Sequence, residues 1–193
     1  MARGRPSFAL AITCLALLAA AGTTLLAACG GPTRYRNDTY RFSLKVDRPL
    51  VEWRSSGTAE GRGFQVAFVD PDGAKAGDRH LDALTVTAVT SPTSVTIDQL
   101  DKLRAALGEL AVKMVQSLGT DTSTGSSSAV SVGGLPGIVV PYATTIGGQR
   151  VVGWQYLLVG GGHTYGLNAG AAGADWNRLR PVFEKAVQSF ATF

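Results

Sequence analysis

The chain contains 193 residues, with 18 basic side chains, 14 acidic side chains and two cysteines. This length provides one domain with a sizeable core and leaves no room for a second domain. The formal net charge of +4 falls to +2 when Arg3 and Arg5 are removed with an N-terminal leader, because 16 basic residues then remain against 14 acidic ones. A balance so close to neutral argues against a nucleic-acid partner.

Residues 1–28 have the order of a secretory leader, in which the two arginines precede an uncharged apolar run from residue 8 to residue 28. The run ends in Leu26-Ala27-Ala28-Cys29, which resembles the lipobox of bacterial lipoproteins. That resemblance implies cleavage between Ala28 and Cys29 and attachment of fatty acids such as palmitate at Cys29, on the extracytoplasmic face of the cell membrane. The alternative is an uncleaved transmembrane helix over residues 8–28, which also anchors the domain outside the cytoplasm.

The segment after the leader is predicted to be a lipidated cysteine and tether, residues 29–38, followed by one α/β domain over residues 39–193. The tether lacks an apolar period. The other cysteine, Cys14, leaves with the leader, so the exported domain retains no free thiol for a disulfide or a thiolate metal site.

Strands are expected first, because apolar and polar residues alternate from Tyr40 to Val46 with the period of a half-buried strand. Residues 63–69 and 84–89 are two further candidates. The sequence Asp-Pro-Asp-Gly at 70–73 lies between them and favours a turn. These segments predict consecutive strands of an antiparallel sheet.

A helix is predicted from Ile97 to about Leu118, because apolar residues recur there at spacings of three and four. Thr96 with Gln99 forms a capping box, Val95 with Leu100 a hydrophobic staple, and Gly119 a stop. The apolar stripe comprises Leu100, Leu103, Leu107, Leu110, Met114 and Leu118. We expect it to cover the sheet as core, the alternative being a groove for a partner or lipid.

The segment 119–128 is polar and of low complexity, and it predicts a flexible loop with candidate O-glycosylation sites. A three-strand meander follows at 137–145, 149–159 and 163–169, with glycines at its turns. A helix at 177–189 closes the chain. The predicted fold class is α+β, an antiparallel sheet covered by a long central helix and a C-terminal helix.

Short motifs at both ends of the domain carry a family resemblance. The start Tyr40-Arg41-Phe42-Ser43-Leu44, followed by Pro49 and Trp53, is similar to the opening of PsbP-like domains, and the segment from Phe183 to Ser189-Phe190 resembles their C-terminal helix. Behind a lipobox, this order of elements looks like the actinobacterial lipoproteins of the LpqN type. The resemblance implies a PsbP-like α/β/α sandwich and a non-enzymatic role in assembly or binding, with no catalytic residues to carry over.

Catalytic and metal motifs give no independent prediction of chemistry. His80 and His163 stand in no metal-ligand spacing, and the stretch 160–166 reads as a hairpin turn rather than a phosphate loop. Four carboxylates, Asp70, Asp72, Asp78 and Asp82, leave a calcium site open as the less favoured alternative to a solvated acidic loop. No cofactor, no metal and no catalytic residue is therefore predicted.

Three functions remain from the sequence. The favoured one is a lipid-anchored binding or assembly module that docks a protein of the cell envelope. The second is a carrier of a lipid or other hydrophobic small molecule, with Leu107, Trp154, Tyr156 and Tyr165 as candidate lining. The third is an envelope hydrolase that uses Asp, Glu and His163 without a recognisable motif.

Overall fold

The computed structural model describes residues 31–57, 63–91 and 97–193, and the side chains of the first helix from residue 104 onward. Residues 32–193 form one compact unit. The leader, Cys29, the predicted cap at Thr96 and the predicted staple lie outside the described residues.

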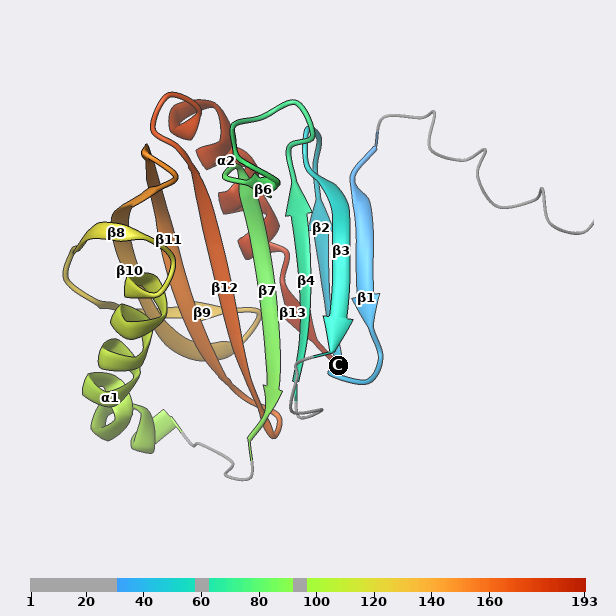
Figure 1. Ribbon diagram of the computed structural model, residues 1–193. Coiled ribbons are helices and arrows are strands. Elements are labelled where there is room, and N and C mark those ends of the chain that lie inside the picture. Colours follow the sequence, from blue (N-terminus) through green and yellow to red (C-terminus); the bar gives the residue numbers. More distant parts are fainter. Residues whose placement is uncertain (1–30, 58–62, 92–96) are drawn as a thin grey trace, which may run out of the picture. The chain divides into compact units, whose positions relative to one another are not determined.

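An antiparallel sheet dominates the described part of the domain, and all of its paired strands run in alternating directions (Figure 1). Its order is β3-β4-β7-β12-β11-β10-β8, with β9 also paired to β10. The bounds are β3 Val51–Gly57, β4 Gly63–Val69, β7 Ala83–Thr90, β8 Thr120–Thr124, β9 Ser128–Val132, β10 Leu135–Ile146, β11 Gln149–Gly160 and β12 His163–Ala172. The predicted strands at 63–69 and 84–89 and the predicted meander are confirmed, and the meander strands are longer than expected.

The remaining elements lie on or beside this sheet. A small sheet has the order β1-β2-β13, and a short hairpin pairs β5 with β6. Their bounds are β1 Thr33–Asn37, β2 Phe42–Val46, β13 Ala191–Thr192, β5 Lys75–Ala76 and β6 Arg79–His80. Helices α1, Ile97–Gln116, and α2, Trp176–Gln188, lie on opposite faces of the large sheet (Figure 1). The fold is thus α+β, with antiparallel sheets and two helices.

The segment expected to be a tether contains a strand. Thr33–Asn37 forms β1, which pairs with β2 over its whole length. The single aromatic residue of β1, Tyr35, packs against Phe42 and Phe68 at centroid distances of 5.8 and 5.4 Å. Asn37 then accepts a hydrogen bond from the Tyr40 backbone N–H at 2.9 Å and shapes the turn into β2. One buried contact and one side-chain cap are enough to order a segment that shows no apolar period.

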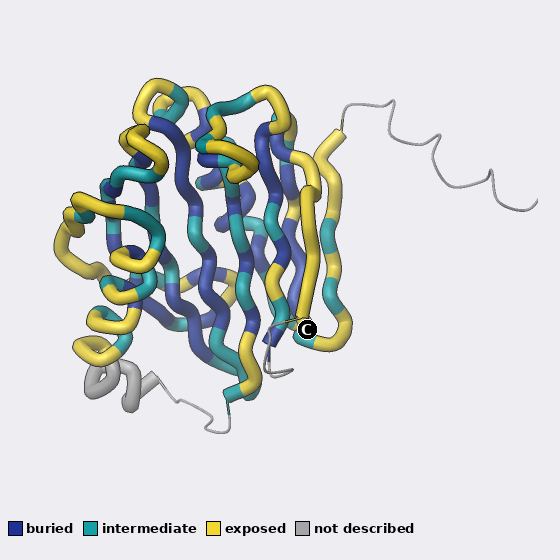
Figure 2. The backbone as a smooth tube through the Cα atoms, viewed as in Figure 1, coloured by how far each residue is buried: buried dark blue, intermediate teal, exposed yellow. Residues whose placement is uncertain are grey.

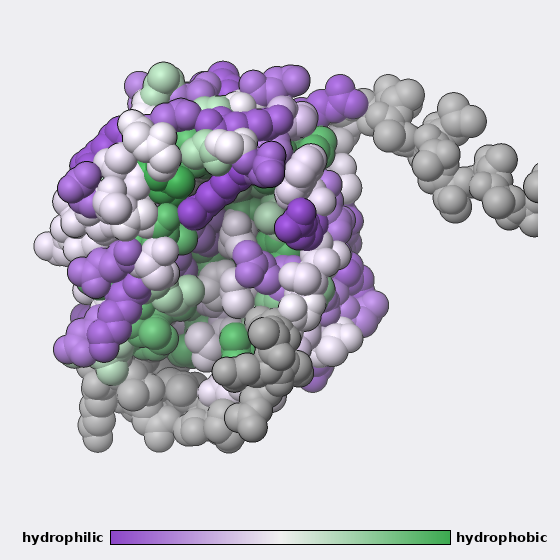
Figure 3. Space-filling view, viewed as in Figure 1, coloured by the Kyte–Doolittle hydropathy of each residue, from purple (hydrophilic) through white to green (hydrophobic). Residues whose placement is uncertain are grey.

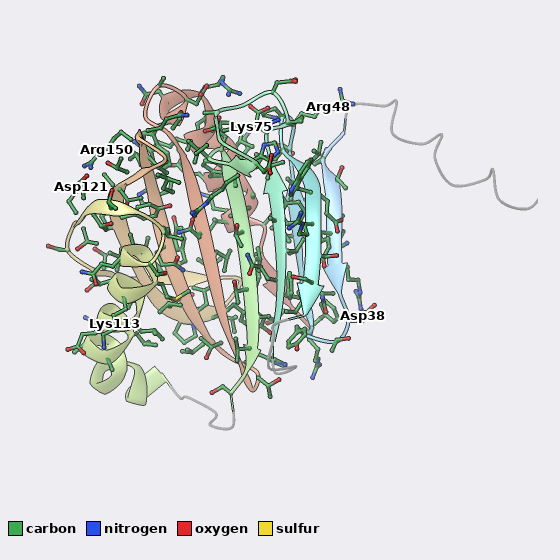
Figure 4. The ribbon with its side chains drawn as sticks, in the orientation of Figure 1. Asp38, Arg48, Lys75, Lys113, Asp121 and Arg150 are labelled. Atoms are coloured by element: carbon green, nitrogen blue, oxygen red, sulfur yellow. The ribbon has the colours of Figure 1, made fainter. Side chains whose placement is uncertain are left out.

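The polar segment 119–128 also contains regular structure, contrary to the expectation of a flexible loop. Thr120–Thr124 forms β8 at the edge of the large sheet, where Thr122 shares a 2.7 Å hydrogen bond with the buried Thr144 hydroxyl. Arg150 donates to the Asp121 carbonyl at 3.2 Å (Figure 4). Backbone hydrogen bonds between the strands and side-chain hydrogen bonds, rather than apolar burial, order this segment. Hydropathy patterns do not detect such bonds.

The rear face of the large sheet carries the main core, under α2 and the small sheet. Alternation along β7 and β12 buries Leu84 and Val86 with Tyr165 and Leu167 on this side. The inner strands are accordingly buried in Figure 2, whereas β1 and β3 are exposed. The predicted buried residues of the last helix, Leu179, Phe183, Ala186 and Val187, face this core, and Phe190 follows them.

Phe42 is the centre of an aromatic cluster within that core. Its ring lies 5.6 Å from Phe190, 5.9 Å from Tyr165 and 6.5 Å from Phe64, between centroids. The Tyr165 hydroxyl donates to the Tyr40 carbonyl at 2.8 Å. These contacts attach the small sheet and the end of the chain to the large sheet.

Helix α1 packs on the front face, but over one end of the sheet rather than its centre. Ala111, which is fully buried, and Leu107 meet Ile138 and Val140 of β10, and Val115 meets Tyr142. The predicted stripe is shifted, because Leu110 is 45% exposed while Ala111 and Val115 are buried. The small side chain of Ala111 allows the helix to approach β10 closely. Because the helix lies over β10, it leaves β3, β4 and β7 uncovered.

The turn at 70–73 is held by two buried carboxylates. Asp82 is fully buried and accepts hydrogen bonds from the backbone N–H groups of Ala74 and Ala172, at 2.9 and 2.8 Å. Burial raises the pKa of the Asp82 carboxyl, although both hydrogen bonds act to lower it. Asp70 forms an ion pair with Arg178 of α2 at 2.9 Å. The turn, the end of β12 and α2 are thereby joined.

Replacement of Phe42 by alanine is expected to lower the free energy of unfolding by about 4 kcal/mol, because it empties the centre of the aromatic cluster. Phe193→Ala is the matched control, since Phe193 is 39% exposed at the end of the chain. We expect its effect to stay below about 1 kcal/mol. Urea unfolding followed by circular dichroism measures both, and equal losses would contradict the assignment of Phe42 to the core.

Replacement of Asp82 by alanine is expected to cost about 3 kcal/mol, because it leaves two backbone N–H groups without acceptors in a dry site. Asp72→Ala in the same turn removes an exposed carboxylate and should change stability by less than about 0.5 kcal/mol. Thermal and urea unfolding of the two variants provide the comparison. A stable Asp82→Ala protein would show that the carboxylate does not hold the turn.

Candidate functional site

An open cleft occupies the part of the front face that α1 leaves uncovered. Two contiguous hollows form it, with volumes of about 430 and 630 Å³. Both are lined by Gln65 of β4, Thr85 of β7 and the hairpin residues Arg79 and His80. Figure 3 shows this face hollowed between α1 and β3. The cleft therefore crosses the sheet surface from the helix to the edge strand.

The floor of the cleft is polar because β4, β7 and β12 each alternate between core and surface. Thr85 and Thr87 of β7 point away from the core side that holds Leu84 and Val86. Gln65, Thr85 and Thr87 make no side-chain hydrogen bond to another described residue. Polar groups without protein partners on a concave surface are available to a ligand.

A chain of side-chain hydrogen bonds crosses the floor and fixes the direction of its amides. The Tyr142 hydroxyl donates to Asn168 Oδ1 at 3.1 Å, and Asn168 Nδ2 donates to Gln155 Oε1 at 3.0 Å. Gln155 Nε2 then donates to the Tyr156 carbonyl at 2.9 Å. Each amide nitrogen retains one N–H with no partner among the described residues. Gln155 is buried and Asn168 is half-buried, so Asn168 is the residue of this chain that offers a donor to the cleft.

Tyr142 has its place because two glycines make room for its ring. A methyl group at Gly170 would lie 2.5 Å from the Tyr142 hydroxyl oxygen, and one at Gly153 would lie 2.6 Å from the same oxygen. Burial raises the pKa of Tyr142 to about 12, although the Asn168 hydrogen bond and the nearby charge of Arg79 act to lower it. The hydroxyl thus stays protonated at neutral pH and remains a donor to Asn168.

The upper wall comes from the β5–β6 hairpin and the end of β3. Trp53, 52% exposed, packs edge-on against the His80 ring with centroids 4.6 Å apart. His80 Nδ1 lies 3.3 Å from the Asp70 carbonyl, which can only accept, so the Nδ1–H donates to it. Arg79 Nη1 donates to the Leu118 carbonyl at 3.0 Å and joins the hairpin to the end of α1.

This arrangement is suited to binding a polar ligand. It combines oriented amides, free hydroxyls, the guanidinium groups of Arg54 and Arg79 and an exposed indole, the mixture that recognises a polar group attached to an apolar or planar one. Among the described residues, no group of His, Cys, Asp and Glu has the proximity needed to hold a metal ion. The carboxylates of the turn at 70–73 hold backbone N–H groups and Arg178 instead.

The four residues named as lipid lining do not meet in one cavity. Leu107 belongs to α1 on the front face, whereas Tyr165 is 1% exposed in the rear core and Tyr156 packs against that core. Trp154 also lies at the rear, against Trp176 at a centroid distance of 4.7 Å. Trp154, Tyr156 and Tyr165 thus lie in one layer on the rear face, where Trp154 meets Trp176 of α2.

His163 lies apart from the cleft. Its ring contacts Tyr40 and Tyr165 at 5.8 Å between centroids, and Nδ1 lies 3.0 Å from the Gly161 carbonyl. No acidic side chain is hydrogen-bonded to it among the described residues. Sequence reasoning missed the cleft residues, although the alternation of β7 places Thr85 and Thr87 together on the side opposite the core.

No described helix is both long enough and apolar enough to cross a membrane. No protein-family model matches the chain, and no curated protein matches it either.

Solved structures share the fold at low sequence identity. The solution structure of cyanobacterial PsbP (CyanoP) from Synechocystis sp. PCC 6803 matches with a TM-score of 0.62 and 14% identity, over 90% of this chain and 99% of that one. A Bacteroides thetaiotaomicron protein matches with a TM-score of 0.51 and 10% identity, over 85% of this chain but only 49% of its own length.

LpqN of Mycobacterium tuberculosis, described as involved in cell envelope biogenesis, matches with a TM-score of 0.41 and 15% identity, over 86% of each chain. At that TM-score the likeness carries no argument, so the predicted relation to LpqN-type lipoproteins stays a prediction. The likeness to CyanoP shows that the domain has a PsbP-like fold.

Proposed function

We propose that this protein is a lipid-anchored, non-enzymatic binding module of the cell envelope, and that the open cleft on the front face is its binding surface. The anchor is Cys29, held on the extracytoplasmic side of the cell membrane, and the bound partner is an envelope protein. The lipobox sequence Leu26-Ala27-Ala28-Cys29 supports the anchor.

The single observation that carries the binding role is the polar floor of the cleft. Gln65, Thr85 and Thr87 lie on a solvent-accessible hollow without hydrogen bonds to other described residues, beside the exposed Trp53. A ligand that replaces the water on these groups with its own hydrogen bonds gains about 0.5–1.5 kcal/mol for each bond. The histidine of the cleft, His80, is hydrogen-bonded to a backbone carbonyl rather than to a carboxylate, which favours binding over acid–base catalysis.

Carriage of a lipid is the less supported alternative. A carrier encloses an acyl chain in an apolar cavity, whereas this cleft is open and combines hydroxyls and amides with apolar residues such as Met114, Leu118 and Ile146. The candidate lining residues are divided between two faces of the sheet. The front-face hollow therefore suits a partner with polar groups better than an acyl chain.

Replacement of Cys29 by serine is expected to abolish lipidation and to release or misprocess the protein, because the acyl chains attached at Cys29 are lost. Cell fractionation and intact mass of the N-terminus measure the result. An unmodified N-terminal mass in the wild-type protein, or full membrane retention of Cys29→Ser, would sink the lipid anchor.

Filling of the cleft by Thr85→Tyr is expected to reduce partner capture at least about fivefold in cells, as a bulky ring displaces the ligand from the floor. The readout is in-cell crosslinking with mass spectrometry on the anchored protein. Ser131→Tyr, on the exposed face of β9 outside the cleft, is the matched control and should leave capture unchanged. Equal capture by both variants would place the binding surface elsewhere.

A further inference from the structure

The charged groups of the cleft have an excess of positive charge. Arg54, Arg79 and Asp78 are the residues with a formal charge at neutral pH among those that line the two hollows. The described lining thus contains two guanidinium groups and one carboxylate. The hollow between α1 and the sheet centre contains Arg79 and no acidic side chain in its described lining.

The cleft also contains hydrogen-bond donors with no described partner. Arg79 uses one N–H of its fork on the Leu118 carbonyl, and the rest of the fork has no described partner. The Asn168 carbonyl oxygen accepts from the Tyr142 hydroxyl, and its amide nitrogen, which donates to Gln155, keeps a second N–H with no described partner. Gln65, Thr85 and Thr87 add side chains that can donate or accept.

A donor-rich, weakly cationic cleft fits an oxyanion, and the details favour a carboxylate over a phosphate. Phosphate sites in proteins are typically built from a helix N-terminus or a nest of backbone N–H groups. Here α1 presents its C-terminal end, with Ser117 and Leu118, to the cleft, and that end carries partial negative charge. With Asp78 also nearby, a single group that carries two negative charges, such as phosphate, is disfavoured, and a group that carries one, such as a carboxylate, is matched.

We propose that the cleft seats a carboxylate of an acidic segment of the partner protein, with Arg79 as its principal charged contact and the Asn168 amide and Thr85 hydroxyl as further donors. Trp53 covers the apolar part of the same segment. The inference rests on the proposed function, because it names the chemistry of the partner at the same surface. The excess of arginine over acidic residues in the cleft favours an acidic segment of a protein as its occupant.

The test is binding of glutarate to the full-length lipidated protein in a non-ionic detergent, at constant ionic strength, followed by the indole ¹H–¹⁵N resonances. We expect a saturable shift of the Trp53 resonance and none at Trp154, which lies on the rear face. Glutaramide, the neutral isostere, should bind at least about tenfold more weakly. Absence of a glutarate shift at Trp53, or equal binding of glutaramide, overturns the proposal. Inorganic phosphate that binds more tightly than glutarate overturns it in favour of a phosphate ligand.

Arg79→Gln is expected to weaken glutarate at least about tenfold, because the charge-assisted hydrogen bonds are lost. Arg150→Gln is a matched control, since Arg150 is also an exposed arginine that donates to a backbone carbonyl but does not line the cleft. It should bind within about twofold of wild type. If Arg79→Gln fails to fold, Arg54→Gln replaces it, and an unchanged affinity in the folded variant contradicts the proposal.

The failures of the two proposals are distinguishable. If glutarate does not bind while Thr85→Tyr still abolishes partner capture, the carboxylate is wrong and the binding surface stands. If Thr85→Tyr captures as well as wild type, the cleft is not the binding surface, whatever glutarate does. Glutarate in excess should also compete with partner capture in membranes, and undiminished capture at saturating glutarate counts against the carboxylate.

Discussion

Packing of the small sheet and α2 onto the rear face of the large sheet is the contact on which the other features depend. Phe42 brings β2 against Phe64, Tyr165 and Phe190, and these rings fill the space between the layers. Because this face buries most of the apolar side chains, the opposite face does not have to be covered by another layer. The front face can then carry hydroxyls and amides at the positions that alternate with the core.

Helix α1 turns that free face into a cleft by its position at one end. Ala111 and Val115 pack closely on β10, so the helix stands beside the uncovered strands as a wall. The β5–β6 hairpin supplies the second wall, and Arg79 joins the two through the Leu118 carbonyl. The buried Asp82 fixes the base of the hairpin through the Ala74 N–H. The hairpin wall is therefore hydrogen-bonded both to a residue that follows α1 and to the buried Asp82.

Much of this architecture follows from the sequence, and the exceptions have physical reasons. The strand at 63–69, the meander and α2 show clear apolar periods, and the structure contains them. β1 and β8 show no apolar period. A ring contact at Tyr35 orders β1, and a hydroxyl contact at Thr122 orders β8. The buried face of α1 contains Ala111 and Val115, whereas the predicted Leu110 is exposed. Alanine is weakly hydrophobic, but its small side chain lets the backbone of α1 approach that of β10.

The cleft itself was not predictable in the same way. Its residues come from β4, β7, β12 and the β5–β6 hairpin, far apart in the chain, and each of them looks like an ordinary wet-face residue in its own segment. Only the pairing of Thr85 with Asn168 across β7 and β12 brings them to one surface. The position of α1 over β10, which decides what stays uncovered, depends on packing that no local pattern records.

The two-sided pattern of β7 has a consequence for how the protein tolerates change. Leu84 and Val86 face the core while Thr85 and Thr87 face the cleft, so the same backbone ladder specifies both surfaces. A slip of β7 by one residue against β12 would exchange the two sets, placing hydroxyls in the core and aliphatic groups in the cleft. The core and the polar surface of the cleft are thus specified by the same strand, and a change in the register of β7 would alter both at once.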